Sequence, residues 1–104
     1  MLLFLYCIMV TVEVVEKEIV RVHPRVHERH PEISDDDVRT AWYGAVVSIA
    51  RVQKYPVQYV AIGFDGKGRA IEMVAIRDAP LLWTIFHAMT PPSQKTYREL
   101  QVRI

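Results

Sequence analysis

The chain has 104 residues, of which 51% are hydrophobic and 24% charged, a composition typical of one small folded domain spanning residues 1–104. Its net charge of +1 gives no bulk attraction for nucleic acid, and its single cysteine, Cys7, excludes an internal disulfide and a zinc site built from cysteines. A lone cysteine fits the reducing cytoplasm, where we expect the protein to act.

Charge is divided unevenly along the sequence. Residues 1–50 contain five Lys or Arg and eight Asp or Glu, a net −3, whereas residues 51–104 contain eight and four, a net +4. A local basic surface in the second half would attract phosphate groups, and an ordinary solvated surface accounts for the same imbalance.

The opening segment, MLLFLYCIMV, is apolar but too short to cross a bilayer, and it lacks the features of a secretion signal. Residues 1–8 are either a buried edge strand or an extension upstream of a start at Met9. Residues 10–15, VTVEVV, are predicted to form a strand. We expect no membrane partner, and the apolar segment and open strand edges favour assembly into a homo-oligomer.

Two helices are expected in the first half. Apolar residues within 19–26 follow helical spacing, but Pro24 does not fit a helix interior, so this helix is placed at about residues 23–30 with Pro24 in its first turn. A second helix is predicted to run from Ser34, a side-chain cap followed by three aspartates, to about residue 46. Residues 46–52 could continue this helix or begin a strand.

The second half is organised around three consecutive strands. Residues 57–64 have the alternation of a strand, a turn at Asp65-Gly66-Lys67-Gly68 follows, and residues 70–77 and 81–89 form the next two strands. A last helix is expected at about residues 93–100. The predicted fold is α+β: an antiparallel twisted sheet of about four strands with two N-terminal helices and a short C-terminal helix.

Three histidines, His23, His27 and His30, share one face of the first predicted helix. A pair four residues apart can bind zinc, but no third ligand follows and no HExxH pattern is present, so no metal or other cofactor is expected. The remaining alternatives are a solvated basic face shared with Arg25 and Arg29, or a part in an RNA-contacting or acid–base site.

A second candidate centre is His87, which lies in the third strand among apolar residues. It is either a hydrogen-bonded edge histidine or a proton-transfer group, with Lys95, Tyr97 and Arg98 just downstream. Strand arginines add to the candidates. These are Arg69 and Arg77, which either pair with nearby carboxylates or bind phosphate.

Two stretches together resemble the BrnT-like toxins of the wider RelE-like group. The first is RHPEISDDDV, residues 29–38, with Ala41 beyond it. The second is YVAIG, residues 59–63, then GRAIEMV, residues 68–74, then IFHAM, residues 85–89, before a short basic helix. The resemblance covers roughly residues 23–100.

The resemblance implies the toxin of a type II toxin–antitoxin pair, a metal-independent endoribonuclease that blocks translation. Its partners would be a cognate antitoxin and RNA, including ribosome-associated mRNA. Such an enzyme needs a base for the ribose 2′-hydroxyl, a cation at the phosphate and an acid for the leaving oxygen. The implied catalytic residues are His87, His30 and Arg69, and the implied RNA-binding residues are Arg77, Lys95, Arg98 and Arg29.

One departure from the family pattern bears on this implication. Where the family has Ser-Ala-Arg, this chain has His87-Ala88-Met89, so a histidine replaces the serine and the arginine is lost. Either His87 has taken over part of the chemistry, or activity is reduced. Two alternatives stand beside the ribonuclease: a non-catalytic protein-interaction domain of the same fold, and a metal-binding domain that uses the histidine helix.

Overall fold

A computed structural model describes residues 18–101. The strand predicted at residues 10–15 and the segment 1–8 lie outside the described residues. Within residues 18–101, no helix is long and apolar enough to cross a membrane.

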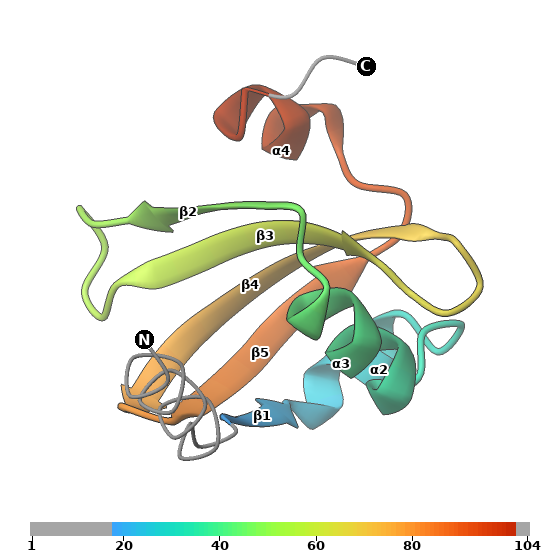
Figure 1. Cartoon of the computed structure of the whole chain (residues 1–104), viewed down its shortest axis with the longest axis horizontal. Helices are drawn as coiled ribbons and strands as arrows, with labels where there is room; N and C mark the ends of the chain where they lie inside the picture. The colour runs from blue at the N-terminus through green and yellow to red at the C-terminus, as the bar shows by residue number, and fades with distance from the viewer. Residues whose placement is uncertain (1–17, 102–104) are drawn as a thin grey trace, which may run out of the picture.

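The described residues form an α+β fold around one five-stranded sheet with the order β1-β5-β4-β3-β2 (Figure 1). Strand β1 is parallel to β5, and the other neighbours are antiparallel. The elements in chain order are β1 (Ile19–Val22), α2 (Pro24–Arg29), α3 (Asp35–Tyr43), β2 (Val47–Arg51), β3 (Gln58–Phe64), β4 (Ala70–Ala79), β5 (Leu82–Met89) and α4 (Gln94–Glu99).

The expectation of about four antiparallel strands is corrected in two places. Residues 46–52, which the sequence left open, contain β2 at the edge of the sheet. Residues 19–22, whose spacing looked helical, form β1 instead, because Ile19 to Val22 pair with Leu82 to Ile85 of β5. This pairing makes the sheet mixed. The two N-terminal helices and the short C-terminal helix lie within one to three residues of their predicted bounds.

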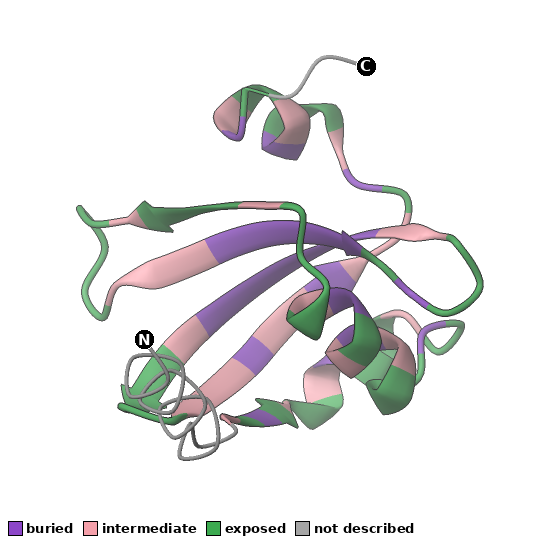
Figure 2. Ribbon diagram, viewed as in Figure 1, coloured by how far each residue is buried: buried purple, intermediate pink, exposed green. Residues whose placement is uncertain are grey.

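Helices α2 and α3 cover one face of the sheet, and α4 lies over the other (Figure 1). The core beneath α2 and α3 contains Ile33, Val38, Ile71, Met73 and Ile85, each with no exposed surface. A smaller apolar cluster joins α4 to the opposite face. Its buried members are Val60, Ile62, Val74 and Leu100. Figure 2 shows that buried residues are concentrated in the middle of β3 and β4.

Alternate residues of β4 therefore face different layers. Ile71 and Met73 belong to the cluster under α2 and α3, whereas Val74 belongs to the cluster under α4. Glu72 lies between the first two and so projects to the α4 side. This places a carboxylate in a buried position where a strand normally presents an apolar side chain.

Candidate functional site

The buried carboxylate of Glu72 is bound to His87, which lies beside it on β5. His87 Nε2 donates to Glu72 Oε2 at 2.7 Å. In the sheet, His87 of β5 pairs with Val74 of β4, and Glu72 lies two residues before Val74. The Glu72 side chain is 7% exposed and that of His87 is 31% exposed. The carboxylate is thus enclosed, while the imidazole reaches the surface.

The other oxygen of Glu72 is bound by the start of α4. The Ser93 backbone N–H and hydroxyl donate to Oε1 at 2.8 and 3.1 Å, and Ser93 also caps α4 by accepting from the Thr96 N–H. Burial opposes ionisation of this carboxyl, but the hydrogen bonds from His87, Ser93 and Thr96 outweigh it and lower the pKa of Glu72 from 4.5 to about 2. Glu72 is therefore an ionised acceptor at neutral pH.

This arrangement fixes the imidazole of His87. With Nε2 donating to an ionised carboxylate, Nδ1 of the neutral ring carries the free lone pair. A carboxylate that holds one histidine nitrogen in this way orients the ring and stabilises the imidazolium formed when the other nitrogen takes a proton. His87 can therefore act as a proton acceptor and then as a donor.

Strand β1 pairs along β5 only as far as Ile85, and α2, which follows β1, then contacts β5. On the α4 side of the sheet, a cavity of about 260 Å³ lies between α2, β4, β5 and the start of α4, and we call it the His87 cavity. It is lined by Arg25, Arg51, Glu72, Val74, Phe86, His87, Ser93, Lys95 and Thr96.

Three cations from three different elements line the His87 cavity. Arg25 comes from α2, Arg51 from the end of β2 and Lys95 from α4. Within the described residues, neither Arg25 nor Lys95 has a carboxylate within 4 Å. Both can therefore contact an anion that enters the cavity, while the charge of Lys95 also acts on Glu99 at longer range.

Arg51 also fastens α4 to the sheet. Its Nε and Nη2 donate to the two oxygens of Glu99 at 2.7 and 2.8 Å, and its Nη1 donates to Gln58 at 2.9 Å. The hydrogen bonds from Arg51 lower the pKa of Glu99, in spite of partial burial. This two-bond pair and the Glu72–Ser93 contact hold α4 at both ends.

The structure brings together some of the sequence-predicted residues. Lys95 shares the His87 cavity, and Arg98 lines the cavity next to it. Arg29 is one helical turn beyond Arg25, on the same side of α2. His87 and Lys95 therefore share one cavity and Arg98 lines the adjacent one, whereas Arg29 lines neither of these two cavities.

Arg69 is placed elsewhere, in a structural cluster at the turn between β3 and β4. Its Nε donates to Asp65 at 2.8 Å, its Nη2 to Asp37 at 3.1 Å and its Nη1 to the carbonyl of Glu32 at 3.2 Å. Burial opposes ionisation of Asp65, but its bonds to Arg69 and to backbone N–H groups lower its pKa. Arg69 ties this turn to the start of α3 and does not line the His87 cavity.

Arg77 and His30 also lie apart from His87. Arg77 donates to the carbonyl of Pro80 and stacks over Trp83, with its guanidinium carbon 5.4 Å from the ring centroid. His30 ends α2 and lies 3.6 Å from Glu32. Neither residue lines the His87 cavity, so Lys95 is the one cation of its lining that the sequence predicted.

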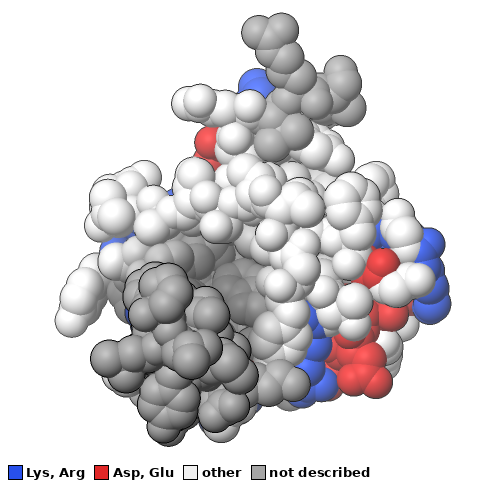
Figure 3. Space-filling view, in the orientation of Figure 1, with Lys and Arg blue, Asp and Glu red and all other residues white. Residues whose placement is uncertain are grey.

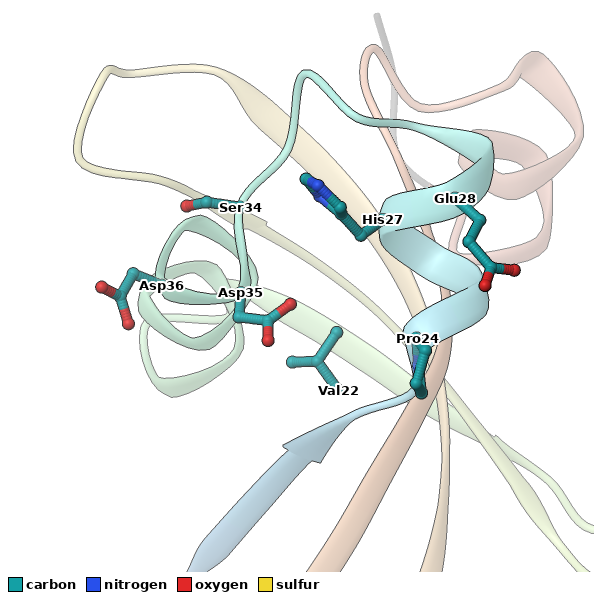
Figure 4. A pocket seen from close by; sticks show the side chains of 7 residues that line it. All are labelled: Val22, Pro24, His27, Glu28, Ser34, Asp35 and Asp36. Atoms are coloured by element: carbon teal, nitrogen blue, oxygen red, sulfur yellow. The ribbon is translucent and has the colours of Figure 1, made fainter.

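Another cavity, of about 620 Å³, lies between α2 and the start of α3, and we call it the far cavity. Figure 4 shows His27 reaching toward the loop before Ser34, while Glu28 and Asp36 point away from each other. His23 instead caps α2 by accepting from the Arg25 N–H. Among residues 18–101, no three His, Cys, Asp or Glu side chains are close enough together to hold a metal ion.

Sequence reasoning missed three residues of the site: Arg25, Arg51 and Glu72 were not assigned to it. A signal existed for Glu72, since the strand AIEMVAI is apolar on both faces and Glu72 is a lone carboxylate on the face that it shares with Ala70 and Val74. No local signal existed for Arg51, because residues 46–52 were left open between helix and strand and its partner Glu99 is 48 residues away.

Comparisons with known proteins add no relative to this picture. No family model, no curated protein and no solved structure matches the chain.

Proposed function

We propose that the protein is a toxin-like endoribonuclease of a type II toxin–antitoxin system, cutting RNA without a metal or other cofactor by acid–base chemistry at His87. One observation carries the proposal: an imidazole oriented by a buried, ionised carboxylate opens into a cavity with three cations. A proton-transfer group beside positive charge is what cleavage of a phosphodiester by its own 2′-hydroxyl requires.

We infer the following reaction for this arrangement. Nδ1 of His87 takes the proton of the ribose 2′-hydroxyl, and the 2′-oxygen forms a bond to phosphorus. The bond from phosphorus to the 5′-oxygen breaks, and the proton returns from the imidazolium to that oxygen. The products are a 2′,3′-cyclic phosphate and a 5′-hydroxyl. Arg25 and Lys95, which have no carboxylate within 4 Å in the described residues, stabilise the negative charge that gathers on the phosphate oxygens.

The loss of the family arginine at position 89 is compatible with this chemistry. Met89 pairs with Glu72 across the two strands, so an arginine there would lie beside that carboxylate. In this chain, Glu72 is bound to His87 and Ser93, and the positive charge comes from α2, β2 and α4. His87 thus supplies the proton-transfer group in place of the family serine. Because Met89 has no charge, Glu72 remains bound to His87.

The setting of this activity belongs to the same proposal. The enzyme acts in the cytoplasm on RNA, including mRNA on the ribosome, and a cognate antitoxin holds it inactive. An antitoxin that covers the His87 cavity would block the imidazole and neutralise its cations at once, which favours an acidic segment as the inhibiting part.

RNA cleavage by purified wild-type protein and by His87→Ala tests the proposal. We expect the variant to lose cleavage by about 100-fold or more, the usual contribution of a positioned proton-transfer group. His27→Ala removes a histidine from the far cavity and serves as the matched control, with unchanged cleavage. Growth arrest on expression should likewise be relieved by His87→Ala alone. Equal cleavage by all three proteins would refute the assignment.

A second candidate function is a non-catalytic interaction domain of the same fold. It is favoured by the outer edge of β2, which has no strand neighbour among the described residues. Apolar side chains are exposed there: Val46 is 66%, Ile49 37% and Val52 74% exposed. Such an edge can add a strand from a partner. Folded protein that neither cuts RNA nor arrests growth would favour this function.

A further inference from the structure

A second cavity of about 470 Å³ lies next to the His87 cavity, between the end of β2 and α4. We call it the basic groove. The residues that line it all have polar or charged side chains, and they are Arg51, Gln53, Lys54, Lys95, Arg98 and Glu99.

The basic groove has a surplus of positive charge. Its lining has four cations and one carboxylate, Glu99, which is already held by two hydrogen bonds from Arg51. Lys54, Lys95 and Arg98 have no carboxylate within 4 Å in residues 18–101, and all three are exposed. Three cations without such partners around one hollow attract an anion.

The two cavities are adjacent. Arg51 and Lys95 line both of them, so an anion in one cavity would lie near an anion in the other. The contacts from Glu99 to Arg51 and from Ser93 to Glu72 fix the position of α4, and with it the positions of Lys95 and Arg98. RNA presents such a series of anions, because each nucleotide adds one phosphate to the backbone.

We propose that the basic groove binds a phosphate next to the one that is cut, through Lys54, Lys95 and Arg98. This inference rests on the proposed function and adds to it the substrate class: a single strand at least one nucleotide longer than the dinucleotide that the chemistry needs. Cationic side chains contact phosphate without reading the base, so the groove supplies affinity and register but no sequence preference.

The test compares two substrates that differ only in flanking phosphates. A dinucleoside monophosphate contains the scissile phosphate alone, whereas a single-stranded RNA octamer also occupies the basic groove. Lys54→Gln and Arg98→Gln should each lower kcat/KM for the octamer about three- to fivefold and the pair about tenfold or more. On the dinucleotide, kcat/KM should stay within about twofold of wild type. Lys54→Arg and Arg98→Lys keep the positive charge, so each should cut the octamer as the wild type does.

A binding measurement separates failure of this inference from failure of the proposed function. Octamer affinity is measured by fluorescence anisotropy in the His87→Ala background, with and without the two groove substitutions. If the wild-type protein cuts both substrates and the groove variants change neither cleavage nor binding, the second phosphate position is refuted and the endoribonuclease function stands. If the protein cuts neither substrate but the groove variants lose octamer binding, the endoribonuclease function is refuted and the groove remains an RNA-binding site. Groove variants that weaken cleavage of both substrates alike would also overturn the second phosphate position.

Discussion

At Gly63, one hydrogen atom in place of a side chain decides how closely α3 packs on the sheet. A Cβ built at this position would lie 1.9 Å from the carbonyl oxygen of Ala41 and 2.8 Å from its carbonyl carbon. Both are backbone atoms of a helix, so they cannot move aside as a flexible side chain would. We therefore expect Gly63→Ala to destabilise the protein by about 3 kcal/mol, measured by urea unfolding.

The matched control for Gly63→Ala is Gly66→Ala in the turn between β3 and β4. A Cβ at Gly66 meets no atom within 4 Å, so its free energy of unfolding should stay within about 0.5 kcal/mol of wild type. If Gly63→Ala were as stable as Gly66→Ala, α3 would not lie against β3 at this distance.

Glu72 makes the free energy of unfolding depend on pH. Its pKa is about 2 when folded and 4.5 when exposed, so its contribution is complete above pH 4.5 and is lost as the pH falls toward 2. The difference corresponds to roughly 3 kcal/mol. Glu72→Gln should therefore lower the free energy of unfolding by up to this amount at pH 7, and the two proteins should approach each other near pH 2.

Denaturant unfolding of both proteins at a series of pH values from 7 to 2 measures this convergence. The pKa values of Asp37, Asp65 and Glu99 are also lowered, so their contributions to the stability of the fold are likewise lost as the pH falls. Only the difference between the two proteins therefore isolates the contribution of Glu72. Glu28→Gln, at an exposed position of α2, is the control and should follow wild type at every pH. Parallel curves for wild type and Glu72→Gln would contradict the role given to its hydrogen bonds.

At the scale of elements, the sequence predicted those whose signals are local. The β3–β4 turn is marked by Asp65 to Gly68, and Gly68 has a φ of +80°, a conformation that favours glycine. Helix α3 begins where Ser34 and Asp37 form reciprocal hydrogen bonds with each other's backbone N–H groups, as its capping sequence indicates. The residues that define each of these elements thus lie within a few positions of one another in the sequence.

The elements that were missed depend on distant partners. Strand β1 is a strand because Val20 and its neighbours pair with β5, more than 60 residues later, and no property of residues 19–22 alone indicates this. The site follows the same rule. His87 and Lys95 could be predicted from their chemistry, whereas Arg25 and Arg51 join them only because α2 crosses the edge of β5 and Glu99 holds the end of β2.

For the whole molecule, the net charge of +1 hides two surfaces of opposite character. The linings of the His87 cavity and the basic groove together contain five cations and two carboxylates, and both carboxylates are already hydrogen-bonded. The far cavity contains Glu28, Asp35 and Asp36 and no Lys or Arg. Figure 3 shows acidic and basic side chains side by side over the region of α3 and the β3–β4 turn, where Asp37 contacts Lys67 and Arg69. Acidic and basic side chains are thus paired at the β3–β4 turn. Near α4, by contrast, Lys54, Lys95 and Arg98 have no carboxylate within 4 Å in the described residues.

This separation predicts how RNA binding responds to salt. Arg25, Lys54, Lys95 and Arg98 are the cations of the two cavities without a carboxylate within 4 Å in the described part of the chain. Four phosphate contacts to a single strand give a slope of about −3 for log K against log salt concentration. The double variant Lys54→Gln, Arg98→Gln should reduce the slope to about −1.5, measured with the RNA octamer in the His87→Ala background.

Arg77→Gln provides the control for this slope, because Arg77 is bound to Pro80 and stacked on Trp83 away from both cavities. Its slope should equal that of the His87→Ala protein. If Arg77→Gln reduced the slope as much as the loss of a groove cation does, Arg77 would be an RNA-binding residue, as the sequence predicted. A slope near zero for every protein would mean that the unpaired cations around α4 do not meet phosphate, since counterion release accompanies any such contact.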